Sequence, residues 1–151
     1  MRLEKYKIQF DSNRTAFEFT SEGSKGRILK RVEYSKIKYK GVKNYYNLGF
    51  GDISVNSDEI DDTVVTDNQD REKIIATVAS TIFIFIKRYP KASIIIRGSN
   101  KARIRLYRMA ISKYFDELSE TFDIQGYFNE NWLPFEKNID YEAFLITRKI
   151  S

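Results

Sequence analysis

The chain has 151 residues, a mass of 17.8 kDa and a formal net charge of +5, and it contains no cysteine and no histidine. These two absences exclude a disulfide framework, a thiolate nucleophile, a histidine-based catalytic triad and the common transition-metal sites. The length fits one domain, and a hydrophobic fraction of 42% is high enough for a packed core. We therefore expect a single α+β domain over residues 1–151 that holds no cofactor.

No segment has the pattern of an export signal or a membrane anchor. The first five residues are rich in charge and lack the apolar stretch of a signal peptide. The longest apolar run, residues 82–86, is far too short to cross a bilayer. The sequence therefore predicts a cytoplasmic protein with no membrane partner.

The charges are arranged in three blocks. Residues 25–43 hold eight cations and one acid, residues 52–70 hold seven acids and no cation, and residues 87–108 hold eight cations and no acid. Clustered lysine and arginine side chains attract polyanions, so the two basic blocks are the natural places to look for a binding surface.

The first fifty residues predict an antiparallel sheet. Apolar side chains recur at every second position in four segments, which is the period of a half-buried strand. These segments are 6–10, 17–19, 28–34 and 46–50. Turn-rich sequences separate them, which favours a meander of hairpins.

Two helices and three more strands follow. Apolar residues at helical spacing predict one helix from about residue 70 to just before Pro90, and a second from about Lys101 to Phe122. The β-branched run 81–86 leaves a strand as the alternative within the first helix. Strands are predicted near 93–97, 123–128 and 141–147. The fold class is thus α+β, a mainly antiparallel sheet in the order β-β-β-β-α-β-α-β-β, with two helices packed on one face.

The turn between the 93–97 strand and the second helix is the strongest candidate site. Glycine permits close backbone approach, serine or asparagine can cap the helix, and four cations follow in its first three turns. The residues are Gly98, Ser99, Asn100, Lys101, Arg103, Arg105 and Arg108. Backbone N–H groups and guanidinium groups are good donors to phosphate or carboxylate. We predict an anion site here; the alternative is an ordinary strand-to-helix turn with a solvated basic face.

The first basic block offers a second candidate surface. Lys36, Lys38 and Lys40 share one face by alternation, and Tyr34 and Tyr39 lie between or beside them. Lysine with tyrosine on a sheet suits phosphate contact combined with base stacking. The alternative is an edge strand that its lysines protect from aggregation.

The acidic block carries a weaker signal. Asp61 and Asp62 are its weak candidates for holding Mg²⁺, because hard cations prefer carboxylate oxygens. The alternatives are a solvated loop in which Asp67 or Asp70 caps the next helix, and a segment that pairs with a basic surface of a second copy. Trp132, beside Pro134 in a predicted loop, would mark a partner surface if its indole is exposed.

Four motifs carry a resemblance to a known family. They are YNLGFGD at 46–52, VTDN at 65–68, GS at 98–99 with RxRLYR at 103–108, and NxxYEAF at 138–144. Together they resemble a family of small single-domain bacterial proteins of unknown function, common in Bacteroidetes. The resemblance covers nearly the whole chain and implies a one-domain bacterial cytoplasmic protein. It implies no activity and no site residues.

These patterns favour a non-catalytic domain that binds nucleic acid or another polyanion. The binding residues would be Lys36, Lys38, Lys40, Arg103, Arg105 and Arg108. One alternative is a small histidine-free nuclease of toxin or defence type, with Arg103 and Arg105 on the phosphate and Asp61, Asp62 or Ser99 nearby. Another is a protein-interaction module, a homodimer or a complex with another protein, whose acidic and basic segments are complementary.

Overall fold

The computed structural model describes residues 4–53, 58–61 and 67–149. In these residues nine strands and three helices follow one another along the chain. The strands are β1 (Gln9–Phe10), β2 (Ala16–Gly23), β3 (Gly26–Tyr39), β4 (Val42–Ile53), β5 (Ile60–Asp61), β6 (Ser93–Arg97), β7 (Phe122–Phe128), β8 (Asn131–Pro134) and β9 (Ala143–Arg148). The helices are α1 (Arg71–Arg88), α2 (Lys101–Lys113) and α3 (Phe115–Ser119).

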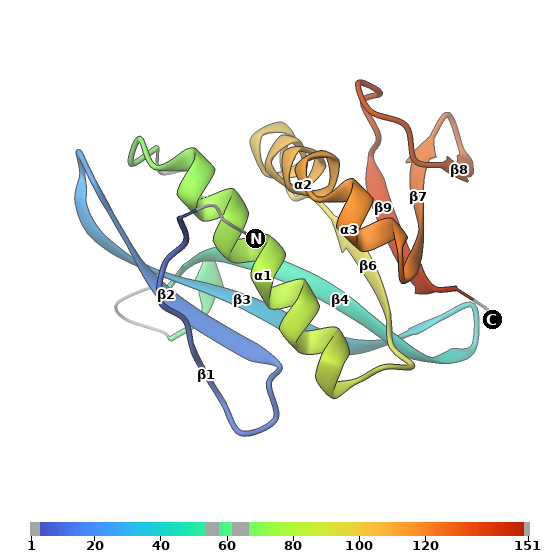
Figure 1. The fold of residues 1–151 in the computed structure, drawn as a ribbon, viewed down its shortest axis with the longest axis horizontal. Coiled ribbons are helices and arrows are strands. Elements are labelled where there is room, and N and C mark those ends of the chain that lie inside the picture. Colours follow the sequence, from blue (N-terminus) through green and yellow to red (C-terminus); the bar gives the residue numbers. More distant parts are fainter. Residues whose placement is uncertain (1–3, 54–57, 62–66, 150–151) are drawn as a thin grey trace.

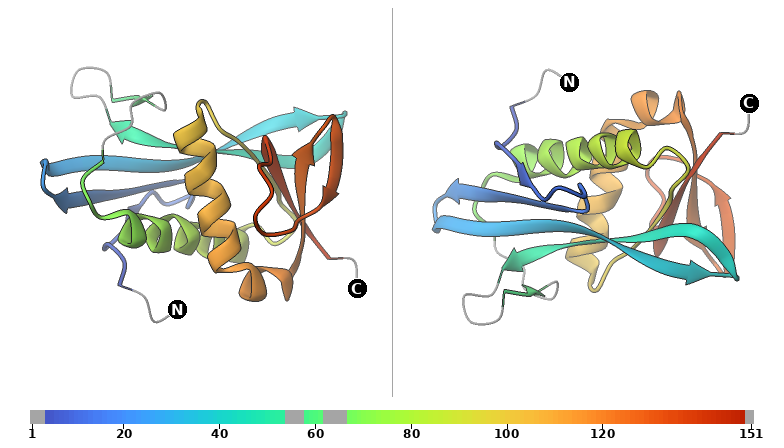
Figure 2. Two further views of the ribbon diagram at one scale, coloured as in Figure 1. Left: turned by 90° about the horizontal axis from the view of Figure 1, so that it is seen from above. Right: turned by 90° about the horizontal axis from the view of Figure 1, so that it is seen from below.

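The strands form one sheet in the order β1-β2-β3-β4-β6-β9-β7-β8, and β5 pairs with β4 beside that path. Of the described pairings, that of β4 with β6 is parallel and the others are antiparallel. Because β9 is antiparallel to both β6 and β7, these two strands run in the same direction. The crossovers through α1 and through α2 and α3 place the helices on one face of the sheet (Figure 1 and Figure 2). The predicted fold class is therefore confirmed.

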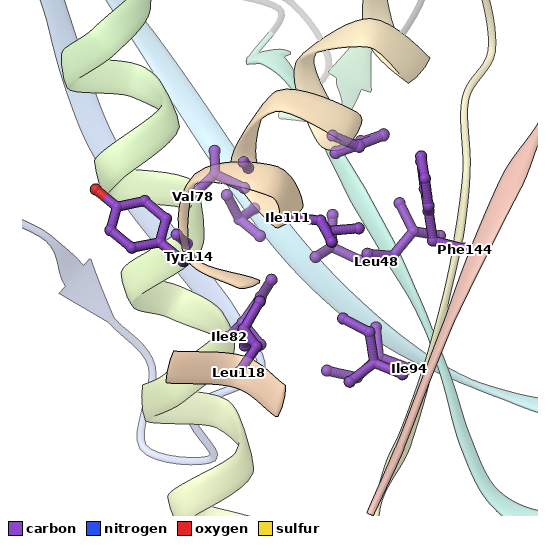
Figure 3. Close-up of a cluster of buried hydrophobic side chains, with 14 of the residues drawn as sticks. Leu48, Val78, Ile82, Ile94, Ile111, Tyr114, Leu118 and Phe144 are labelled. Atoms are coloured by element: carbon purple, nitrogen blue, oxygen red, sulfur yellow. The ribbon is translucent and has the colours of Figure 1, made fainter. Parts of the chain in front are cut away.

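The main core lies between the helices and the sheet. Figure 3 shows part of it, built from side chains of β4, α1, β6, α2, α3 and β9. Its labelled members are Leu48, Val78, Ile82, Ile94, Ile111, Tyr114, Leu118 and Phe144. Every side chain in this set is at most 4% exposed, so the period-two and period-3.6 patterns of the sequence point at one shared interior.

The first helix resolves the ambiguity of the run 81–86 in favour of helix. Thr81 and Phe85 both lie in α1, and both are fully buried. The Thr81 hydroxyl donates to the Val78 carbonyl at 2.7 Å, so its polar group is satisfied inside the helix. Burial on nearly all sides makes the apolar, β-branched composition favourable here, despite its lower helix propensity.

Three predictions of local structure are wrong. The predicted 6–10 strand is reduced to β1, because Tyr6 is buried and its N–H donates to Thr77 Oγ1 of α1 at 2.9 Å. The second helix breaks at Tyr114, whose φ of −108° and ψ of 19° separate α2 from α3 and turn its ring into the core. The predicted loop at Trp132 is the short strand β8. Within the described residues, no helix has the length and apolar character that a membrane span requires.

Candidate anion-binding site

A depression of about 590 Å³ opens beside the first turns of α2. Of the residues predicted for the anion site, those that line it are Gly98, Asn100, Lys101, Arg105 and Arg108. Asp140, Tyr141 and Glu142, from the segment that leads into β9, line it as well. The structure therefore brings most of this candidate site into one hollow, together with two carboxylates that the sequence analysis did not associate with it.

The turn into α2 has a clear local cause. Asn100 is the N-cap residue, and its side-chain Oδ1 accepts a hydrogen bond of 2.8 Å from the Arg103 N–H. Gly98 is required by packing, since a Cβ built there would lie 2.7 Å from Ile104 Cβ and 2.9 Å from Ile104 N. The glycine is thus explained by the close contact of the turn with α2, without a ligand. Ser99 is exposed.

The start of α2 carries positive potential. Its first turn contains no acidic residue, and Lys101 and Arg105 are exposed. Helix geometry leaves the N–H groups of Lys101 and Ala102 without an intrahelical acceptor, and the helix dipole adds to their positive character. Cations at this end of a helix are unfavourable by themselves and become favourable when an anion is present.

Nearby carboxylates limit that potential. Arg108 forms an ion pair with Asp140, so its charge is partly compensated within the depression. Arg105 also lines a neighbouring hollow of about 210 Å³ between α2 and the start of α1, where Asp67 and Asp70 lie. Lys101 and Arg105 are therefore the cations of this site that are best placed to meet a ligand.

Arg103 does not belong to the depression. It is only 7% exposed, and its guanidinium carbon lies 4.8 Å from the centroid of the Phe50 ring. Lys30 is buried at the same ring, with its Nζ 5.7 Å from the centroid and 2.5 Å from Asp52 Oδ1. We call Lys30, Asp52 and Arg103 the interior charge cluster. Members of all three charge blocks therefore meet inside the molecule.

The lysines of the β3–β4 hairpin lie far from the depression. Lys36 is in register with Tyr46, which in turn is in register with Ile94 near the start of β6. Gly98 follows the opposite end of β6, and Lys40 lies beyond the end of β3. At about 3.3 Å per residue, Lys40 and Gly98 are separated by roughly 25 Å along the strands. The two basic surfaces do not form one groove.

Lys36 and Lys38 have the same parity on β3, and Lys40 lies beyond the end of that strand. Between Ile37 and Tyr39 the register shifts, because one residue of β3 lies opposite two residues of β4 and the extra residue of this β-bulge belongs to β4. Lys36 lies on the helix-covered face, because its cross-strand partner Tyr46 places its ring 5.0 Å from that of Phe85 in α1. All three lysine side chains are exposed, and Lys40 Nζ lies 5.3 Å from the Tyr39 ring centroid.

The structure describes one of the two acidic candidates. Asp61 ends β5 and is in register with Asp52 of β4, and Asp62 lies outside the described residues. Among the residues that the structure describes, no three carboxylates are grouped as a metal site. The predicted capping of the first helix by Asp70 is confirmed for its position and not for its side chain. Asp70 is the N-cap residue of α1, but its side chain makes no capping bond.

Asp70 instead ties α1 to the first strands. Its Oδ2 accepts from the Tyr6 hydroxyl and, at 2.5 Å, from Ser21 Oγ. Burial, followed by the hydrogen bond to Asp70, raises the pKa of Tyr6. Asn68, 1% exposed, donates to the Gly26 carbonyl at 2.9 Å and accepts from the Lys25 N–H at 2.6 Å. These contacts are structural, and no spacing in the sequence indicated them.

Neither the curated proteins nor the solved structures compared with this chain include a match. A family comparison, in contrast, matches residues 2–149, which is nearly the whole chain. The match confirms the predicted resemblance to a family of small proteins without an assigned activity. The chain belongs to a family of unknown function, DUF6934.

Proposed function

We propose that this protein is a non-catalytic binding domain for nucleic acid or another polyanion, and that the depression at the start of α2 receives phosphate groups. The observation that carries the proposal is the placement of exposed Lys101 and Arg105 beside the first turn of a helix that has no acid in that turn. Helix dipole, backbone N–H groups and two cations there favour the same ligand charge.

The carboxylates at the site argue for many weak phosphate contacts over one tight anion pocket. Arg108 is paired with Asp140, and Glu142 lines the same depression. The net positive charge available to a single small anion is therefore modest. A polymer of phosphates gains affinity by adding contacts and releasing counterions, so even a modest site contributes to binding.

Fluorescence-anisotropy titration with labelled RNA and DNA, single-stranded and duplex, tests the proposal. The variant with Lys101→Ala and Arg105→Ala should bind about tenfold more weakly at low salt. Its log–log salt dependence should be shallower by about 1.4 to 1.8, which corresponds to two lost phosphate contacts. The control, Lys5→Ala with Arg27→Ala, removes the same charge from two exposed positions outside the depression and should bind like the wild type.

Equal binding by both double variants would overturn the assignment of the site. Absence of binding to all four nucleic acids and to heparin would overturn the proposed function. Gels of the same samples after incubation with Mg²⁺ test the histidine-free nuclease, which stays a prediction. Cleaved substrate would contradict the non-catalytic assignment.

A further inference from the structure

Four aromatic side chains gather at the end of the sheet that lies away from the start of α2. Tyr39 and Tyr45, of β3 and β4, have ring centroids 5.2 Å apart, and Tyr127 and Trp132, of β7 and β8, have ring centroids 5.1 Å apart. The Trp132 indole Nε1 donates to the Tyr39 hydroxyl at 3.0 Å and joins the two pairs. We call these four residues the ring platform. Figure 2 shows that the β3–β4 and β7–β8 hairpins reach the same end of the molecule.

The ring platform lies on the sheet face that the helices leave uncovered. Tyr46 packs against α1, so its neighbour Tyr45 points to the opposite face. In β7, Ile124 belongs to the main core, so Tyr127, three positions later, points away from it. Trp132 is directly opposite Tyr127 and shares that face. All four side chains are half-buried, so their packing fixes them while part of each remains exposed.

The charge around the ring platform suits a phosphate backbone. Residues 34–51 contain four lysines and no acid. Lys40 follows Tyr39 at the end of β3, and its Nζ lies 5.3 Å from the Tyr39 ring centroid. The Lys40 side chain is exposed, whereas the rings are held by one another and by the indole hydrogen bond. Fixed rings with an exposed cation at their margin combine stacking with phosphate contact.

We infer that the ring platform binds single-stranded nucleic acid, with unpaired bases stacked on its exposed ring surfaces and Lys40 on a flanking phosphate. A duplex keeps its base faces inside the helix, so only a single strand can offer them to aromatic side chains. The inference rests on the proposed function in its ligand class. It concerns the opposite end of the sheet, so each site can fail while the other stands.

The wild-type protein supplies its own probe, because Trp132 is the only tryptophan in the chain. Titration with oligo(dT) of about ten nucleotides should quench its fluorescence to saturation. A duplex of the same length and heparin should leave the fluorescence nearly unchanged, because neither presents unpaired bases. Equal quenching by duplex or by heparin would overturn stacking as the mode of binding. Absence of quenching by oligo(dT) would overturn the inference directly.

Variants separate the two sites. Tyr127→Leu should weaken binding of labelled oligo(dT) about tenfold, the loss expected when one stacked base loses its ring. Phe10→Leu removes an exposed ring outside the ring platform, 46% exposed on β1, and should bind like the wild type. Near-ultraviolet circular dichroism checks that each variant is folded, and Tyr127→Phe, which keeps the ring, should retain binding.

The two proposals give different failures. If Tyr127→Leu binds oligo(dT) normally while Lys101→Ala with Arg105→Ala does not, the ring platform is refuted and the α2 site stands. If the charge variant binds normally while oligo(dT) still quenches Trp132 and Tyr127→Leu binds weakly, the α2 site is refuted and the ring platform stands.

Discussion

The lysine side chain in the first half of β3 is buried, whereas the lysine side chains near its end are exposed. Lys30 is 3% exposed beneath the helices, whereas Lys36, Lys38 and Lys40 are exposed near the tip of the hairpin. Lys30 and Lys36 have the same strand parity, so alternation alone does not separate them. The difference is the cover: the helices and Phe50 enclose Lys30, while α1 ends at Arg88 and leaves the tip bare. A charge block in a sequence therefore does not amount to a charged surface.

Removing the buried cation should have the largest effect on stability. Lys30→Ala removes the cation that lies 2.5 Å from the Asp52 carboxylate, which is 15% exposed, and the free energy of unfolding should fall by about 3–5 kcal/mol. Urea denaturation measures this loss. Lys36→Ala is the matched control at the exposed end of the strand and should change stability by less than about 0.5 kcal/mol. Similar values for the two variants would show that burial does not distinguish the two ends of β3.

The same contrast separates two arginines of α2. Arg103→Ala removes a buried side chain that packs on Phe50, so the free energy of unfolding should fall by about 2 kcal/mol. Arg105→Ala removes an exposed one, so stability should change by less than about 0.5 kcal/mol while nucleic-acid binding weakens. Denaturation and anisotropy on both proteins give four readings. If either variant lost both stability and nucleic-acid binding, the distinction between interior and surface arginines would be wrong.

Part of this contrast was accessible from the sequence. The pattern that predicted β3 places Lys30 in the inward set with Val32 and Tyr34. The apolar stripe of α2 includes Tyr107 and Ala110, and Arg103 lies four and seven positions before them, on the same side of the helix. Arg103 was nevertheless predicted to be a binding residue, and Lys30 was counted only as a member of the first basic block, because charge was weighed above position in the period.

Other features had no sequence signal. Periodicity within one element carries no information on how the sheet curls, so the contact of Trp132 with Tyr39, 93 positions apart, could not be inferred. The β-bulge opposite Lys38 likewise depends on how β4 pairs with β3, and no alternation within either strand indicates it. The turn at Gly98 and Asn100 was predictable because capping and close approach are local properties.

Adding one methyl group at each of two glycines compares a position packed against α2 with one on the uncovered face of the sheet. Gly98→Ala would place its Cβ 2.7 Å from Ile104 Cβ, so the turn must shift and stability should fall by about 1–2 kcal/mol. Gly49 lies on the uncovered face of β4, where the nearest atom to an added Cβ is 3.9 Å away. Gly49→Ala should be neutral or stabilising by up to about 1 kcal/mol. Thermal unfolding measures both, and equal effects would mean that the packing of the turn on α2 is loose.

The smallest effect is expected at an exposed carboxylate whose role is local. Asp11 Oδ1 accepts from the Thr15 N–H at 2.9 Å and from the Ala16 N–H at 3.2 Å. Its partial desolvation acts the other way, but these N–H donors prevail and the pKa of Asp11 lies below its ordinary value of 3.8. A carboxylate with a lowered pKa stabilises the fold above its unfolded pKa and loses that contribution as the pH falls through its folded pKa. Asp11→Ala should therefore cost about 0.5–1 kcal/mol at neutral pH and progressively less below about pH 4.

Urea denaturation of wild type and Asp11→Ala at several pH values gives the difference directly. Lys36 is exposed and is not a carboxylate, so the difference in the free energy of unfolding between Lys36→Ala and the wild type should not shrink in the same way in acid. A penalty for Asp11→Ala that stayed constant into strong acid would mean that the side chain acts through its shape, because a protonated carboxyl no longer holds the two N–H groups as an anion does. An exposed charge on this protein then contributes through the donors that face it, and a buried one, such as Lys30, through the carboxylate and the aromatic ring that enclose it.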